Sequence, residues 1–195
     1  MKVLTREDVL SIEEYERQRE SFRSRIIALK QRRRISIGPL ITLVFENRET
    51  LRFQIQEMIR VERILDPDKV QDELDVYNAL LPTGNELSAT LLIEIVEEAK
   101  MKEWLDRFKG LDRGPTVAIK AGGETVFGTF EGGHSHETKI SAVHFVRFRP
   151  RDAMKAAFAD LRQPVSLEVD HNGYHEIVPV PGSMREEWLS DLTDS

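Results

Sequence analysis

The sequence contains no cysteine. This absence excludes disulfide bridges, thiolate zinc sites, cysteine-ligated iron–sulfur clusters and cysteine nucleophiles. Long apolar runs are absent too, since no uninterrupted stretch approaches the roughly 20 residues that a membrane-spanning helix needs. The chain carries charged side chains within its first eight residues, and its start lacks the apolar region of a secretory signal. We therefore expect a cytoplasmic protein with no membrane partner.

The common catalytic signatures are also missing. The chain has no H-E-x-x-H zinc motif and no G-x-S-x-G elbow of a serine hydrolase. The pair Gly122-Gly123 lacks the lysine and hydroxyl residue of a phosphate-binding loop and connects two expected strands, which indicates a hairpin turn. The sequence by itself assigns no reaction.

Positive charge is concentrated in one segment of an acidic chain. The net charge is −6, which argues against nonspecific binding of nucleic acid. Residues 17–34 nevertheless carry eight basic side chains and one acid, whereas residues 66–106 carry eleven acids and three bases. The two segments either neutralise each other within one fold, which we favour, or the basic segment docks an acidic partner or nucleic acid. We predict a helix that contacts acidic surface, in this chain or on a partner, rather than nucleic acid.

Apolar spacing and capping residues predict a series of helices. The first is the longest, with Ser11 as its N-cap and an end near Arg34. Asp66-Pro67 starts another, since proline suits the first helical position. The expected helices cover residues 12–34, 56–65, 67–80, 97–109, 151–161 and 183–192.

Alternating and β-branched runs predict strands between these helices. The Asn172-Gly173 pair indicates a hairpin turn. Because strands occur in adjacent runs, we expect an α+β fold with a mostly antiparallel sheet. At 195 residues the chain fits one domain, 1–195, with a potential sub-domain boundary at 110–115, "GLDRGP". The expected strands cover residues 40–45, 50–56, 87–96, 116–120, 125–131, 141–148, 165–171 and 175–181.

Three of the five histidines lie within "GGHSHETKISAVHF", residues 132–145. His134 and His136 fall in an expected loop, where two imidazoles can bind a metal but are as readily solvated. In a strand over 141–148, His144 shares an apolar face with Val146 and Phe148, which favours a hydrogen-bonded core histidine over a metal ligand.

A short polar helix offers a second candidate. Arg60 and Arg63 in "QIQEMIRVER" would allow bidentate contact with an anionic ligand. Surface ion pairs, each worth little, are the alternative. Both interpretations remain open at this point.

Several stretches resemble an uncharacterised bacterial family, described only as a domain of unknown function. The likeness rests on "LVFENRETLRFQIQEMIRVERI", "ELDVYNALLPTGNELSATLLIE", "ETKISAVHFVRF" and "VDHNGY". It singles out His144, His171 and Tyr174, the last as a candidate binding residue. Members of that family are often encoded beside rubrerythrin-like proteins and iron–sulfur oxidoreductase subunits, so the resemblance implies a redox or oxidative-stress role.

Two functional hypotheses follow. In the first, the protein is a non-catalytic accessory or binding protein that serves such a redox partner. In the second, it is a metal-dependent enzyme or metal-binding protein that holds zinc or iron with His144, His171 and Glu57 or Glu62. The second requires His144 and His171 to approach each other, which we predict from strands that share one sheet.

Overall fold

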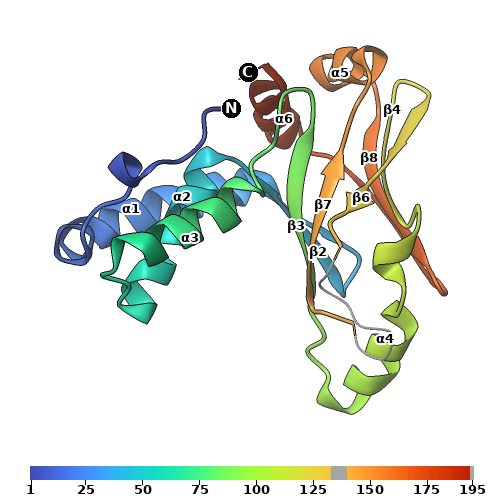
Figure 1. The fold of residues 1–195 in the computed structure, drawn as a ribbon. Coiled ribbons are helices and arrows are strands. Elements are labelled where there is room, and N and C mark those ends of the chain that lie inside the picture. Colours follow the sequence, from blue (N-terminus) through green and yellow to red (C-terminus); the bar gives the residue numbers. More distant parts are fainter. Residues whose placement is uncertain (133–139, 194–195) are drawn as a thin grey trace.

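The computed structural model describes residues 1–132 and 140–193, and it combines helices with two sheets (Figure 1). In chain order its elements are η1 (Arg6–Asp8), α1 (Ile12–Arg33), β1 (Arg34–Ile37), β2 (Ile41–Glu46), α2 (Arg48–Glu62), α3 (Pro67–Asn78), β3 (Leu87–Ile93), η2 (Glu98–Lys100), α4 (Met101–Phe108), η3 (Leu111–Arg113), β4 (Val117–Ala121), β5 (Glu124–Phe127), β6 (Thr129–Phe130), β7 (Val143–Phe148), α5 (Asp152–Ala159), β8 (Val165–His171), β9 (Tyr174–Pro179) and α6 (Gly182–Thr193). The predicted α+β class and the long first helix are confirmed.

The strands form two antiparallel sheets. The five-stranded sheet has the order β1-β2-β3-β7-β6, and the four-stranded sheet has the order β5-β4-β8-β9. Neighbouring strands pair antiparallel throughout both sheets. The predicted hairpin is confirmed, because Asn172 and Gly173 take positive φ angles between β8 and β9.

The main core lies between the two sheets. Alternate residues of each strand point inward, so Leu43, Leu91 and Val146 of the first sheet join Ile119 and Leu167 of the second in one buried cluster. All five side chains are fully buried. The two sheets are therefore layers of one sandwich.

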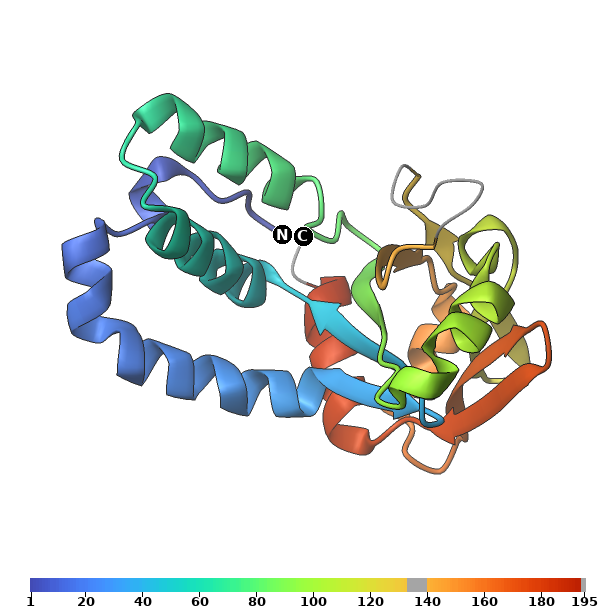
Figure 2. The same ribbon diagram turned by 90° about the horizontal axis from the view of Figure 1, so that it is seen from below.

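Helices α1, α2 and α3 form a lobe on one side of this sandwich, as Figures 1 and 2 both show. Ser11 caps α1 by accepting a hydrogen bond from the backbone of Glu14, as predicted. Asp66 caps α3, with Pro67 in the first helical turn. We call α1, α2 and α3 the helical lobe, and its small cores are separate from the one between the sheets.

The prediction of a strand over 50–56 is wrong, because this segment belongs to α2. Leu51, Ile55 and Ile59 follow each other at four-residue spacing and are buried on one helical face. Asn47 caps the helix through the backbone of Thr50. The alternation of apolar residues in this segment is compatible with both periods, and packing against the neighbouring helices selects the helical one.

The prediction that the strands of His144 and His171 share one sheet is also wrong. His144 lies in β7 of the five-stranded sheet, and His171 ends β8 of the four-stranded sheet. The segment between them, which contains α5, carries the chain from one layer to the other.

The stretch 110–115 leads into β4, the first strand of the second sheet. The buried core draws on residues from both sides of this stretch.

Within the described ranges, no helix combines the length and apolar character that crossing a membrane requires.

Candidate functional site

Glu57 is the centre of a charged network that joins α1 to α2. The Tyr15 hydroxyl donates to its Oε1 at 2.6 Å. Arg19 binds both carboxylate oxygens, with Nε at 2.8 Å and Nη2 at 2.9 Å. Arg60, one turn further along α2, donates from Nη2 at 3.1 Å. Three donors therefore hold one carboxylate in place between the two helices.

These contacts set the protonation states of the network. The bidentate Arg19, followed by Tyr15 and Arg60, lowers the pKa of Glu57 from its ordinary 4.5 to about 2, against the opposing effect of burial. Burial and the adjacent Glu57 carboxylate raise the pKa of Tyr15 well above its ordinary 10.0. At neutral pH Glu57 is thus ionised and Tyr15 protonated, so neither is poised to exchange a proton.

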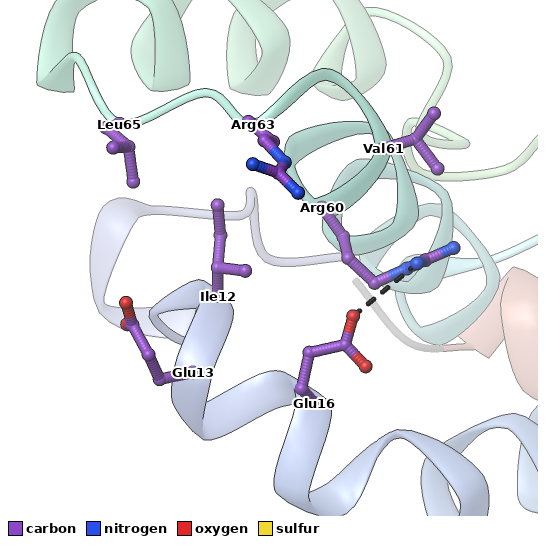
Figure 3. A pocket seen from close by; sticks show the side chains of 7 residues that line it. All are labelled: Ile12, Glu13, Glu16, Arg60, Val61, Arg63 and Leu65. Atoms are coloured by element: carbon purple, nitrogen blue, oxygen red, sulfur yellow. Dashed lines mark hydrogen bonds and ion pairs between the residues drawn. The ribbon is translucent and has the colours of Figure 1, made fainter.

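A groove opens beside this network, between the start of α1 and the end of α2 (Figure 3). Its volume is about 520 Å³. The seven residues that line it are Ile12, Glu13, Glu16, Arg60, Val61, Arg63 and Leu65. It therefore combines an acidic wall on α1, two guanidinium groups on and after α2, and apolar side chains of both helices.

Arg60 and Arg63, the two arginines singled out from the sequence, lie together in this groove. Arg60 Nη1 lies 3.5 Å from Glu16 Oε1, which is a long ion pair. Its Nε is buried and has no hydrogen-bond acceptor within the residues that the structure describes. Arg63 is exposed and ends α2 in the left-handed conformation, with φ of 51°. The groove has the donors to bind a carboxylate, provided that Arg60 is released from Glu16.

From residue 17 to its end, α1 is predominantly basic. Arg19, Arg32 and Arg33 form ion pairs with Glu57, Glu187 and Asp191, and Arg34, which follows α1, pairs with Glu94. The acidic segment 66–106 thus contributes Glu94, while the other acids come from α2 and α6. In the described parts of the chain, four further cations of α1 have no ion pair. They are distributed around the solvent-accessible surface of the helix, and we call this surface the basic face: Arg17, Arg23, Arg25 and Lys30.

His144 is a buried histidine in the sandwich. Only 1% of its surface is exposed, and its Nε2 lies 2.8 Å from the backbone oxygen of Ser141. Its Nδ1 lies 3.8 Å from the carboxylate of Asp112, and its ring meets Phe130 edge to face. These contacts place it on the apolar face expected for a core histidine. His134 and His136 lie outside the described residues.

His171 and Tyr174 both hold backbone groups. His171 Nε2 lies 2.9 Å from the backbone oxygen of Lys109. The buried Tyr174 hydroxyl donates to the backbone oxygen of Ile37 and accepts from the backbone nitrogen of Leu40 at 3.3 Å. Tyr174 therefore ties β9 to the turn between β1 and β2.

The structure does not assemble the predicted ligands into one three-residue metal site. Glu57 is bound to Tyr15, Arg19 and Arg60 in the helical lobe, while His144 and His171 lie in different sheets of the sandwich. Glu62, the alternative carboxylate, is an exposed residue at the end of α2. Across residues 1–132 and 140–193, no three histidine or acidic side chains are grouped so that they could hold a metal ion.

Comparison with known proteins identifies the family. A family model described as "Protein of unknown function (DUF3501)" matches residues 3–192. The chain belongs to the DUF3501 family. A solved structure described as a novel protein of unknown function from Burkholderia pseudomallei K96243 is 36% identical to this chain, with a TM-score of 0.88. The match covers 98% of this chain and 100% of that one. No curated protein matches.

The resemblance to an uncharacterised family is thus confirmed. In this DUF3501 chain the sequence pointed to Glu57, Arg60 and Arg63, but not to Tyr15, Arg19 or the acids of α1 as part of the site. Tyr15 and Arg19 are spaced for one helical face, which was a usable signal. The spacing did not show that this face contacts Glu57, which lies 38 to 42 residues further along the chain.

Acidification is expected to weaken the contact between α1 and α2 through Glu57. The folded pKa of about 2 lies below the ordinary 4.5, so this stabilisation is present above pH 4.5 and is lost as the pH falls toward 2. Because the network is partly exposed, we expect a loss of about 1 kcal/mol. Urea unfolding followed by circular dichroism at several pH values in this window measures it.

The E57Q variant should show a smaller loss of stability over the same window, since glutamine does not titrate. E20Q, which removes an exposed acid of α1 outside the network, should follow the wild type. Identical pH profiles for E57Q and the wild type would contradict the role of Glu57.

Proposed function

We propose that this protein is a non-catalytic, cytoplasmic accessory protein that binds an acidic surface of a redox partner through its helical lobe. The observation that carries the proposal is the basic face of α1. Arg17, Arg23 and Arg25 are exposed and Lys30 is half-buried, on a chain whose net charge is −6. Such a local excess of positive charge steers association with an acidic protein.

The chemistry of the candidate site supports binding rather than catalysis. Glu57 and Tyr15 are held in protonation states far from exchange at neutral pH. His144 and His171 contact backbone oxygens, and Tyr174 bridges two backbone groups. In each case the interaction supports the fold.

The redox assignment comes from the family resemblance. A chain without cysteine has no thiol chemistry of its own, so the proposal places the redox centre on the partner. The candidates are a rubrerythrin-like protein or an iron–sulfur oxidoreductase subunit of the same bacterium.

Charge reversal of the basic face tests the proposal. The triple variant R17E/R23E/R25E should weaken binding to the purified rubrerythrin-like protein or oxidoreductase subunit by at least about tenfold, because rim charges govern steering and specificity. Biolayer interferometry at low and high salt measures the change. Added salt should weaken wild-type binding more than binding of the triple variant.

A matched control separates the basic face from net charge. The variant K69E/K102E/R113E makes the same charge change at exposed positions outside α1. It should keep at least half of the wild-type affinity. No measurable binding of the wild type to either partner, or equal losses in both triple variants, would refute the proposal.

A further inference from the structure

We infer that the groove between α1 and the end of α2 binds a linear segment of the partner protein that carries one carboxylate flanked by apolar residues. Arg63 and Arg60 hold the carboxylate, and the apolar side chains lie against Val61 and Leu65. The inference rests on the proposed function, because it names what the helical lobe recognises.

Two of the three apolar side chains that line the groove are largely exposed. Val61 is 65% exposed and Leu65 76% exposed, and both line the groove together with Ile12 (Figure 3). Covering large aliphatic side chains by a partner is favourable because it removes apolar surface from water. An inorganic anion would leave this surface open, whereas a peptide with leucine-like side chains covers it.

Arg63 is the primary anchor. It follows the last turn of α2, and its backbone nitrogen donates to the Ile59 oxygen in a left-handed cap. Figure 3 draws its side chain between Ile12 and Arg60, at the groove. No ion pair holds its guanidinium among residues 1–132 and 140–193. A free guanidinium beside apolar surface is suited to bidentate binding of a carboxylate.

Arg60 is the second anchor. Glu16 occupies the place beside Arg60 that a carboxylate of the partner would take. Arg60 Nη2 is oriented by Glu57, while Nη1 reaches Glu16 only at 3.5 Å. Glu16 is half exposed and can swing into solvent at little cost. The buried Nε without an acceptor shows that the present arrangement leaves Arg60 incompletely satisfied. A carboxylate of the partner displaces Glu16 and pairs with Arg60 and Arg63 together.

The acidic wall limits what the groove accepts. Glu13 and Glu16 lie on the α1 side, across from the arginines. A run of several acids would be repelled by these two carboxylates, whereas one carboxylate exchanges for Glu16 and leaves the local charge balanced. The groove therefore selects a single acid in an apolar context over a polyacidic tract.

The test uses a synthetic peptide and the full-length protein. The probe is a fluorescently labelled Leu-Leu-Glu-Leu-Leu peptide with blocked termini, and the comparison peptide has glutamine in place of glutamate. Fluorescence anisotropy should show about tenfold tighter binding of the glutamate peptide, as expected for a charge-assisted pair. R63Q should remove that preference, and V61S should weaken both peptides.

Substitution of Glu16 tests most directly whether this carboxylate competes with the ligand. If Glu16 competes with the ligand, E16Q should bind the glutamate peptide about threefold more tightly than the wild type. A merely structural Glu16 would make E16Q neutral or weaker. R113Q, which removes an exposed arginine of the sandwich, is the control for long-range charge and should bind like the wild type. Circular dichroism melting confirms that each variant is folded.

The outcomes separate this inference from the proposed function. Equal affinity for the two peptides, equal losses in R63Q and R113Q, or binding by E16Q that is no tighter than that of the wild type would overturn the groove as a carboxylate site. Peptide binding with the expected variant pattern, but no binding to the redox partners, would keep the site and refute the redox assignment. Partner binding that depends on the basic face, without glutamate-dependent peptide binding, would refute only the groove.

Discussion

Replacing Arg33 with glutamine is expected to lower the free energy of unfolding by about 3–5 kcal/mol, the range for breaking a buried ion pair by removing one partner. Arg33 ends α1 and is 1% exposed. Its Nη1 and Nη2 each donate to Asp191 at 2.8 Å, and its Nε donates to Glu187 at 3.0 Å. Without Arg33, two carboxylates of α6 lie close together in a largely dry site, and α1 loses its buried charged link to α6.

Arg32 supplies the matched control for Arg33. It pairs with the same Glu187 at 2.8 Å, but its side chain is exposed. R32Q should therefore cost less than about 1 kcal/mol, as exposed ion pairs do. Urea unfolding of both variants near neutral pH, followed by circular dichroism, makes the comparison. Similar losses in R32Q and R33Q would show that burial of Arg33 does not decide the effect.

Replacing Trp188 with alanine is the second large effect, with an expected loss of about 3–5 kcal/mol, typical of a buried aromatic truncated to alanine. Trp188 is fully buried on α6. Its ring centroid lies 4.6 Å from that of Phe45 on β2 and 5.2 Å from that of Phe158 on α5. Alanine would leave a cavity where a strand and two helices meet, and the rigid neighbours cannot close it.

Trp188→Phe tests whether the ring volume or the indole nitrogen matters. Within the described residues, the buried indole Nε1 has no hydrogen-bond partner. The nitrogen therefore adds no stabilisation, and phenylalanine should cost about 1–2 kcal/mol, from lost ring volume alone. Thermal melting by circular dichroism measures both variants without relying on tryptophan fluorescence. A loss with phenylalanine as large as with alanine would indicate an undetected polar contact of the indole.

Local signals in the sequence predicted the elements that depend on a few neighbouring residues. Ser11 before α1, Asp66-Pro67 before α3 and Asn172-Gly173 between β8 and β9 each act through contacts within a few positions. The physical reason is that caps and tight turns are satisfied by the adjacent backbone. Residues 50–56 carry no such local signal for a strand, and their alternation of apolar residues is also compatible with a helix. Packing against the neighbouring helices therefore decided that this segment is helical.

The candidate site likewise combines residues that the sequence indicated with residues that only the tertiary structure brought to it. Arg60 and Arg63 stood out because arginine spacing on a helix is legible from the sequence. Their acidic opposite wall, Glu13 and Glu16, belongs to α1, and only the packing of α1 on α2 brings it there. The sequence could not choose between an anion clamp and surface ion pairs. In the tertiary structure Arg60 is bound to Glu57 and lies 3.5 Å from Glu16, and Arg63 has no ion pair within the described residues.

By itself, the sequence determined the α+β class, the long basic helix and the exclusion of thiol chemistry, because composition and short-range periodicity carry that information. Only the tertiary structure decided that His144 and His171 belong to different sheets and that Arg33 is buried while Arg32 is not. The two arginines are adjacent and chemically identical. What distinguishes them is the direction in which a helix turns each side chain relative to α6, and that direction is set by packing between segments more than 150 residues apart.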